Sequence, residues 1–393
     1  MIKRNKFLPF ALPAIEKEEI NSVVDTLKSG WLTTGPKTKL FENNFCKQVN
    51  GGHAAALNSA TAGLFLSLAA LGIKKGDNVI TTPYTFCATY NVVLENNANL
   101  IFADVKEDDY NINPEEIESK ANGKKIKAII PVHFAGLPCD MQEILKIAKK
   151  KKAYVIEDAA HALSAEYKGR QIGDISGYTG DAAVFSFYAT KNITTGEGGM
   201  VTTRSKKLRD LISVLGLHGI SKDAWKRYTS EGNWYYEVAY PGYKYNMTDI
   251  AAAIGLEQLK KDSRLLKRRE AIASFYTKEL NLVDGISVPF TFKDKRSAQH
   301  LFVLKINENI LKIDRSTFIE KLKEANIGAS VHFIPAHLHP YYRKKFGFKP
   351  SDFPVATKLY KQSLSLPIYP AMSDKDVSYV AATVKEIAKK YKR

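Results

Sequence analysis

The sequence predicts an α/β protein in which a mostly parallel sheet lies between helices, with a smaller C-terminal α/β domain. Apolar strand-like runs alternate with helical patterns between residues 54 and 158, which is typical of a parallel sheet covered on both faces. A chain of 393 residues is also long enough for one large and one small domain. We expect the large domain over residues 1–260 and the small domain over 261–393, with segment 1–30 packing on the small domain.

Hydrophobic spacing assigns the elements in chain order. Residues 14–29 have helical spacing, with Ile15, Ile20, Val23, Val24 and Leu27 on one face. Strands are expected at 54–57, 78–82, 100–105, 128–133, 153–158 and 184–188, and helices at 40–49, 85–96, 114–120 and 141–150. Later elements are a hairpin at 198–204, a helix that ends at Leu215, a long helix from Ile250 to about residue 269, strands at 301–306 and 329–333, a helix at 317–325 with a Thr317–Glu320 capping box, and a last helix from Ser373.

The composition restricts the class of protein. There are 58 basic and 41 acidic residues, and the net charge of +17 favours anionic partners such as phosphorylated small molecules. The basic residues are scattered or end predicted helices, so we expect no nucleic acid partner. We also expect no membrane insertion, because no apolar run is long enough to cross a bilayer. Cys46, Cys87 and Cys139 show no metal or disulfide spacing, which favours the cytoplasm.

A strand, a turn of small residues and the start of a helix follow one another near residue 60. The turn reads Asn58-Ser59-Ala60-Thr61-Ala62-Gly63. The free N–H groups of a helix start, together with the hydroxyls of Ser59 and Thr61, could bind a phosphate. Serine and threonine also favour this position as simple N-caps, so the turn alone leaves both interpretations open.

Lys191 lies just past a predicted buried strand and before the glycine-rich turn at 194–199. The carboxyl edge of a parallel sheet is where open α/β folds bind ligands. A lysine partly removed from water has a lowered pKa and becomes nucleophilic, as a Schiff base to a carbonyl cofactor requires. Taken by itself, Lys191 is more simply an ordinary surface lysine, so its interpretation depends on the residues around it.

Other strand ends carry side chains of complementary chemistry. Phe86 could stack on a flat ring, Asp158 could pair with a cationic ring nitrogen, and Ser186 could bind a phosphate. Two residues of the segment 157–161 have simpler alternatives: Asp158 could cap the next segment, and His161, which could belong to an active site, could instead be a core histidine. Phosphate, aromatic ring, ring nitrogen and aldehyde are the four groups of pyridoxal 5′-phosphate (PLP). The joint occurrence of these residues with Lys191 therefore predicts a PLP site.

Histidines and tyrosines gather after the predicted strand 329–333. They are His332, His337, His339, Tyr341 and Tyr342. Three histidines suggest a metal, but two of them lie on a proline-broken loop without the same-face spacing of a helical site. We therefore expect no metal, and either substrate contact or plain packing for this segment.

The chain resembles the fold-type-I, PLP-dependent sugar aminotransferases of the DegT/DnrJ/StrS type over nearly its whole length. The most specific segments are NSATAGL (58–64), VIEDAAHA (155–162), FSFYATKNITTGEGG (185–199) and GYKYNMTDI (242–250). The resemblance implies that Lys191 is the Schiff-base lysine and that Asp158 pairs with the pyridine nitrogen. It also implies that Phe86 stacks on the ring, that His161 lies beside it, and that Ala60, Thr61 and Ser186 bind the phosphate.

The segment 242–250 departs from the GYNYR form of many members, because Lys244 and Asn246 replace the asparagine and the arginine. Members use this segment to reach the neighbouring subunit. The resemblance therefore implies a homodimer with shared active sites, in which Lys244 or Asn246 contacts the phosphate of the partner's cofactor. The GYKYN form is similar to that of the enzyme that makes UDP-4-amino-4-deoxy-L-arabinose. The expected substrate contacts are Thr34, Lys244, His332 and Tyr341.

The resemblance implies transfer of the amino group of glutamate, which becomes 2-oxoglutarate, to a keto-sugar nucleotide by way of pyridoxamine 5′-phosphate (PMP). The C4 ketone of a UDP- or dTDP-sugar is the favoured acceptor, and a 3-keto sugar is an alternative. A second alternative is a PLP-dependent sugar dehydratase, but the related dehydratases carry histidine where Lys191 stands. A non-catalytic regulator would have a broken active site or a fused DNA-binding segment, and neither is visible.

Overall fold

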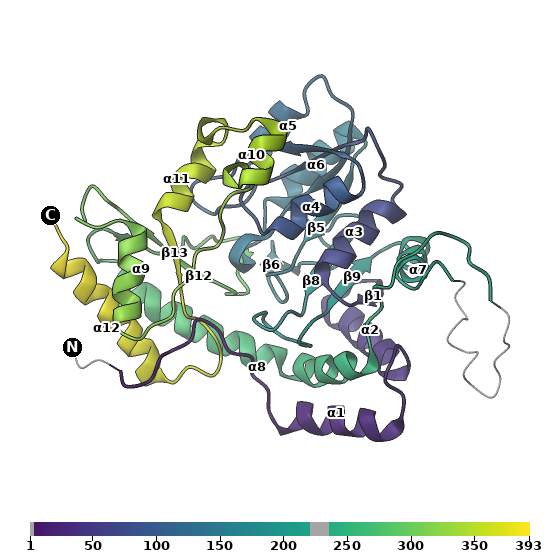
Figure 1. The fold of residues 1–393 in the computed structure, drawn as a ribbon, viewed down its shortest axis with the longest axis horizontal. Coiled ribbons are helices and arrows are strands. Elements are labelled where there is room, and N and C mark those ends of the chain that lie inside the picture. Colours follow the sequence, from purple (N-terminus) through teal and green to yellow (C-terminus); the bar gives the residue numbers. More distant parts are fainter. Residues whose placement is uncertain (1–3, 221–235) are drawn as a thin grey trace.

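A seven-stranded sheet forms the centre of the fold (Figure 1), which a computed structural model describes for residues 4–220 and 236–393. Its strand order is β1-β9-β8-β5-β4-β2-β3. Strands β8, β5, β4, β2 and β3 run parallel, and β9 runs antiparallel to β1 and β8. The strands are β1 (His53–Leu57), β2 (Asn78–Thr81), β3 (Asn99–Phe102), β4 (Ile126–Ile130), β5 (Tyr154–Asp158), β8 (Ala182–Ser186) and β9 (Gly199–Thr203). The predicted fold class is therefore confirmed.

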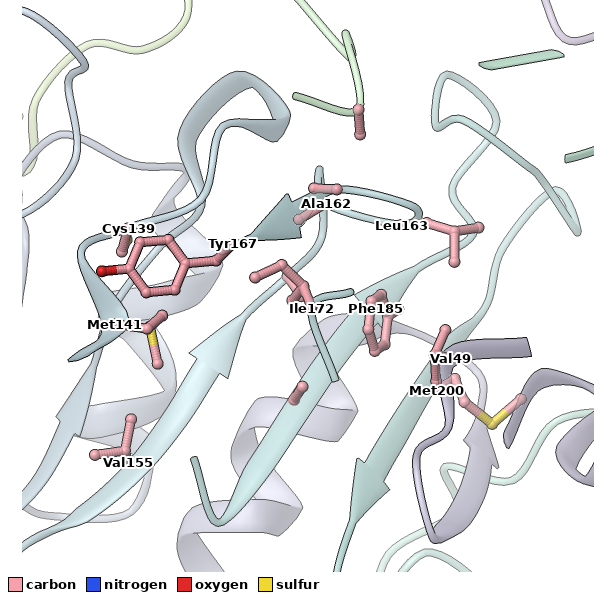
Figure 2. Close-up of a cluster of buried hydrophobic side chains, with 14 of the residues drawn as sticks. Val49, Cys139, Met141, Val155, Ala162, Leu163, Tyr167, Ile172, Phe185 and Met200 are labelled. Carbon is pink, nitrogen blue, oxygen red and sulfur yellow. The ribbon is translucent and has the colours of Figure 1, made fainter. Parts of the chain in front are cut away.

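Helices cover both faces of this sheet. They are α2 (Pro36–Val49), α3 (Ala60–Ala70), α4 (Cys87–Glu95), α5 (Pro114–Lys120), α6 (Met141–Lys151), α7 (Lys206–Leu215) and α8 (Asp249–Leu280), whereas α1 (Lys17–Ser29) packs on α8. Consecutive strand residues point to opposite faces, so Phe185 and Val184 of β8 join different hydrophobic clusters. Helices α2, α5, α6 and α8 contribute to the cluster of Phe185, and α3, α4 and α7 to that of Val184. Figure 2 shows part of the first cluster, with Phe185 and Met200 projecting from β8 and β9.

The C-terminal part contains a second, three-stranded sheet in the order β10-β12-β13. Its elements are β10 (Ile286–Ser287), β12 (Phe302–Ile306), β13 (Ser363–Leu366), α9 (Arg315–Glu324), α10 (Pro340–Phe346), α11 (Pro354–Gln362) and α12 (Asp374–Lys390). The short elements of the described residues are β6 (Glu166–Tyr167), β7 (Arg170–Gln171), β11 (Lys295–Arg296) and the 3₁₀ turns η1 (Phe134–Gly136), η3 (Ala336–Leu338) and η4 (Pro350–Asp352). Helix α8 continues through residue 260, so the predicted domain limit falls inside a helix that joins both parts. No described helix is long and apolar enough to cross a membrane.

Three predictions for the C-terminal half were wrong. The predicted capping box at Thr317 is absent, because α9 begins earlier, at the N-cap Asp314, which accepts the backbone N–H of Thr317 at 2.8 Å. The predicted strand 329–333 is reduced to a single bridge between Ser330 and Ser365, and β13 supplies the third strand instead. The long helix continues to Leu280, well beyond residue 269, because its later turns pack into the small-domain core.

The N-terminal segment crosses the small domain before it reaches α1. Leu8 exchanges backbone hydrogen bonds with Asn326 and Gly328, both at 2.8 Å. Helix α1 then lies along α8 (Figure 1) with its polar side inward. Buried Glu19 accepts hydrogen bonds from Gln258 and Lys261, at 2.9 and 3.0 Å.

The predicted helix 14–29 is therefore present, but its apolar face points away from the protein. Ile20 and Leu27 are 56% and 52% exposed. We call this surface the outer stripe of α1; it consists of Ile15, Ile20, Val24 and Leu27.

Candidate active site

A cavity of about 410 Å³ opens where β1, β5 and β8 end. Asp158 and Ser186 are the last residues of the neighbouring strands β5 and β8, so the parallel register brings them to one edge. The cavity collects eight of the predicted site residues, namely Ala60, Thr61, Phe86, Asp158, His161, Ser186, Lys191 and His332. Its lining also contains residues that were not predicted from the sequence, among them Phe10, His300, Leu301, Phe333 and Ile368.

Four predicted residues lie outside this cavity in the single chain. Thr34 and Asn246 line a separate hollow of about 820 Å³, where Asn246 Nδ2 donates a hydrogen bond to Thr34 Oγ1 at 2.6 Å. Lys244 is exposed on the same segment. Tyr341 is 58% exposed and borders another surface hollow beside α4. The structure of the single chain therefore does not bring these four residues into the Lys191 cavity.

Lys191 is held in a tight turn past the end of β8. Its backbone N–H donates to the carbonyl of Tyr188 at 2.9 Å, and its half-buried side chain lines the cavity. Removal from water lowers the pKa of Lys191 to about 8, against an opposing effect of Asp158. A minority of the amine, far larger than for an ordinary lysine, is therefore neutral near physiological pH, and a neutral amine can act as a nucleophile or as a base.

Asp158 is buried at the floor of the cavity. Its Oδ2 accepts a hydrogen bond from Thr89 Oγ1 at 2.7 Å, and its Oδ1 accepts one from the backbone N–H of Ala160 at 3.2 Å. Burial nevertheless raises the pKa of the Asp158 carboxyl above its usual value, because these donors and Lys191 only partly replace water. A cation that approached from the cavity would stabilise the carboxylate, and a protonated ring nitrogen is such a cation.

The start of α3 has both features that the sequence left open, a side-chain N-cap and free N–H groups that could bind a phosphate. Ser59 acts as the N-cap, and its Oγ accepts the N–H of Ala62 at 3.1 Å. Helix geometry then leaves the N–H groups of Ala60 and Thr61 without an intrahelical acceptor, beside the cavity. A Cβ on Gly199 would lie 2.5 Å from Ala60 N, so only glycine lets β9 approach this turn so closely. The N–H groups and the nearby Ser186 hydroxyl suit a phosphate.

Three neutral histidines face Lys191 in the cavity. Burial lowers the pKa of His161 and His300 well below the usual value, and that of His332 to about 4, with Lys191 adding to each effect. The rings of His161 and His300 lie 4.2 Å apart, and Phe10 stacks on His332 at 5.2 Å. Within the described ranges, no group of three His, Cys, Asp or Glu residues could hold a metal ion.

Comparison with known proteins gives a consistent result. The family model for DegT/DnrJ/EryC1/StrS aminotransferases matches residues 13–385. The chain is 58% identical over 384 residues to the uncharacterized protein MJ1066 of Methanocaldococcus jannaschii. It is also 52% identical over 388 residues to the spore coat polysaccharide biosynthesis protein SpsC of Bacillus subtilis. Both alignments cover 98% of each protein.

A solved structure has the same architecture. The putative sugar aminotransferase Spr1654 of Streptococcus pneumoniae, determined in PMP and PLP forms, superposes with a TM-score of 0.90. For the PMP form, the identity is 34% and the match covers 98% of this chain and 99% of that one. Because the family model and the relatives extend over the sheet, the Lys191 cavity and the small domain alike, the chain belongs to the DegT/DnrJ/EryC1/StrS aminotransferase family.

Proposed function

We propose that the protein transfers the amino group of glutamate to the ketone of a nucleotide-linked sugar, with PLP as its cofactor. The carrying observation is a single cavity that contains the low-pKa amine of Lys191, the buried carboxylate of Asp158 and the free N–H groups at the start of α3. When bound, PLP supplies an aldehyde that carries amino groups and a ring that accepts electrons from the substrate. The family and the PLP and PMP forms of Spr1654 support this cofactor.

Each site residue then has a defined task. The Nζ atom of Lys191 removes a proton from the α-carbon of the amino donor and delivers it to the accepting carbon. The Asp158 carboxylate holds a proton on the ring nitrogen. The N–H groups of Ala60 and Thr61 and the hydroxyl of Ser186 bind the phosphate, and Phe86 supplies an aromatic face at the cavity wall.

The lining suits a sugar better than a strongly charged group. Among the described lining residues, Lys191 is the single lysine or arginine. The remaining wall consists largely of aromatic rings, neutral histidines and small hydroxyl side chains, which can bind the C–H faces and hydroxyls of a sugar ring. A diphosphate would need cations from outside this lining. The participation of SpsC in polysaccharide biosynthesis agrees with a sugar acceptor.

We propose a homodimer, in which a second copy of the chain supplies such a cation from Lys244. Lys244 and Asn246 lie outside the cavity of their own chain, on the segment that the resemblance assigns to the contact with the neighbouring subunit. The outer stripe of α1 leaves four large apolar side chains in water, which is typical of a surface that another protein covers. Thr34 and Lys244 are proposed to contact substrate in the partner's site, and Asn246 the cofactor phosphate.

The double substitution Ile20→Asp/Leu27→Asp is expected to weaken the dimer by at least about 100-fold, because two buried interface side chains would become charged. Sedimentation velocity over a concentration series measures the change. Leu282→Asp is the matched control, because Leu282 is 92% exposed and lies outside the stripe. A fully active wild-type monomer, or a dimer that the double substitution leaves unchanged, would overturn the proposed assembly.

A half-reaction titration tests the activity itself. Glutamate should convert the PLP-loaded enzyme to its PMP form, and the correct keto-sugar nucleotide should restore the visible PLP absorption. We propose a UDP-4-keto-pentose as the first acceptor, because of the GYKYN segment. A 4-keto-6-deoxyhexose and a 3-keto sugar complete the panel. Restoration by another member would change the acceptor, and failure of glutamate to convert the cofactor would remove the proposed donor.

A further inference from the structure

Asn192, the residue after Lys191, makes two hydrogen bonds that fix both the orientation of its amide group and the position of the hydrogen on His300. Asn192 is buried, and its Nδ2 donates to the carbonyl of Ala298 at 2.7 Å. A carbonyl can only accept, so this contact fixes the orientation of the amide group. Asn192 Oδ1 therefore faces His300 Nδ1, 3.1 Å away, and that nitrogen must carry the hydrogen. The tautomer of His300 follows from the protein itself.

The segment that carries His300 is anchored independently of Lys191. The N–H groups of Ala298 and His300 donate to the carbonyls of Gly136 and Ala135, at 2.9 and 3.1 Å. A Cβ on Gly136 would lie 2.8 Å from the carbonyl oxygen of His161, so glycine is required for this close packing.

Arg269 of α8 strengthens this anchor. Its side chain is buried, and Nη1 donates to the carbonyl of Ile368 at 2.7 Å while lying 3.5 Å from that of His300. Both acceptor residues line the Lys191 cavity. One buried guanidinium thus holds together two segments of the cavity wall, which makes the His300 segment a rigid support.

We propose that His300 is a positioning residue, which through its hydrogen bond to Asn192 holds in place the turn that carries Lys191 into the cavity it shares with Asp158. Neither family membership nor the proposed function requires this contact. Only the expected effect of this contact on the catalytic rate rests on the proposed function. The His300–Asn192 pair joins the catalytic turn after β8 to the segment that leads into β12, and so couples the two parts of the chain at the site.

Two substitutions of His300 separate this role from direct contact with substrate. His300→Asn keeps a side-chain N–H near the position of Nδ1 and removes Nε2, the nitrogen that is free for the cavity. His300→Gln places its amide near the position of Nε2 and removes the donor to Asn192. Asn192→Ala breaks the same hydrogen bond from the other side while His300 stays intact. Circular dichroism and thermal melting confirm that each variant is folded.

The first readout uses the cofactor-free protein and is independent of transamination. An amine-reactive reagent and mass spectrometry give the pH midpoint of Lys191 modification, which is expected near 8 in the wild type. The titratable groups that share the cavity with Lys191 are Asp158, His161, Tyr188, Glu197, His300 and His332 among the described lining residues. In His300→Gln and Asn192→Ala, the midpoint should rise toward 10.5, because a loosened Lys191 regains water. His300→Asn should stay closer to the wild type.

The second readout is the single-turnover rate of the glutamate half-reaction. His300→Gln and Asn192→Ala should each lower it by about 10- to 100-fold, since a misplaced reacting group costs rates of this order. His300→Asn should be about tenfold faster than His300→Gln. The double variant Asn192→Ala/His300→Gln should be no slower than the slower single variant, because both break one contact.

Two outcomes would overturn the positioning role. In one, both His300 variants and Asn192→Ala keep the wild-type midpoint of Lys191. In the other, His300→Asn is the slower His300 variant, which would assign the effect to the cavity-facing nitrogen. If glutamate fails to convert even the wild-type enzyme, the proposed function is wrong, whereas the cofactor-free midpoint still tests the role of His300.

Discussion

Lys191→Ala is expected to reduce transamination by about 10⁴-fold, because one side chain serves both as the attachment point and as the proton carrier. Removing the amine leaves the cavity without another lysine or arginine among its described lining residues. The glutamate half-reaction, followed in a single turnover, measures the loss directly. Absence of the absorption band of a lysine-bound cofactor in the variant would assign the attachment to Lys191.

Lys305→Ala is the matched control for this prediction. Lys305 lies on β12 outside the cavity, and burial lowers its pKa as it does that of Lys191. A lowered pKa alone therefore does not distinguish the two lysines, and only their positions do. Lys305→Ala should retain nearly full turnover. A Lys191→Ala enzyme with wild-type turnover would exclude the proposed mechanism.

The residues at strand ends could be predicted because a parallel sheet converts order along the chain into proximity in space. Asp158 and Ser186 each close a buried apolar run, and a parallel register places such positions at one edge. The start of α3 was recognisable for the same reason, since it follows β1 directly. These positions depend only on local periodicity and on the general geometry of α/β folds.

The rest of the cavity depends on contacts between distant segments, which periodicity does not encode. Phe10 and His300 enter the site only because the N-terminal segment and the small domain pack across the sheet edge. Strand β13 was missed because its serines resemble surface residues. In the fold they are buried, Ser363 beside the Tyr110 hydroxyl at 2.7 Å and Ser365 beside His332 Nδ1 at 2.9 Å.

Helix α1 shows a third reason for failure. Its periodicity was read correctly, but an apolar face normally predicts burial within the same chain. Here the hydrogen bonds of Glu19 and Thr26 hold the polar side inward, because Gln258, Lys261 and Lys37 offer matching groups. If the outer stripe is a dimer interface, the apolar pattern correctly predicts that this face is buried in the assembly, although it is exposed in the single chain.

Asp158→Asn is expected to lower the rate of the glutamate half-reaction by about 10³-fold, because a neutral amide does not hold a proton on the ring nitrogen. The same change should raise the melting temperature of the cofactor-free protein at pH 7. Burial raises the folded-state pKa of Asp158 above its unfolded value, so protonation favours the fold and the charge present at neutral pH destabilises it. The advantage of the asparagine should shrink as the pH falls toward the unfolded-state pKa of about 4, because the folded-state carboxyl, with its raised pKa, takes up a proton first.

Asp104→Asn is the control that separates the two effects. Asp104 is also buried with a raised pKa, but its oxygens accept three backbone N–H groups, from Val105, Val355 and Ala356. An amide cannot accept all three, so this variant should lose stability while each folded molecule keeps its activity. Greater stability with lost turnover in Asp158→Asn, and the reverse in Asp104→Asn, would show that the Asp158 charge is maintained for the cofactor. Equal melting temperatures for Asp158→Asn and the wild type across this pH range would contradict that conclusion.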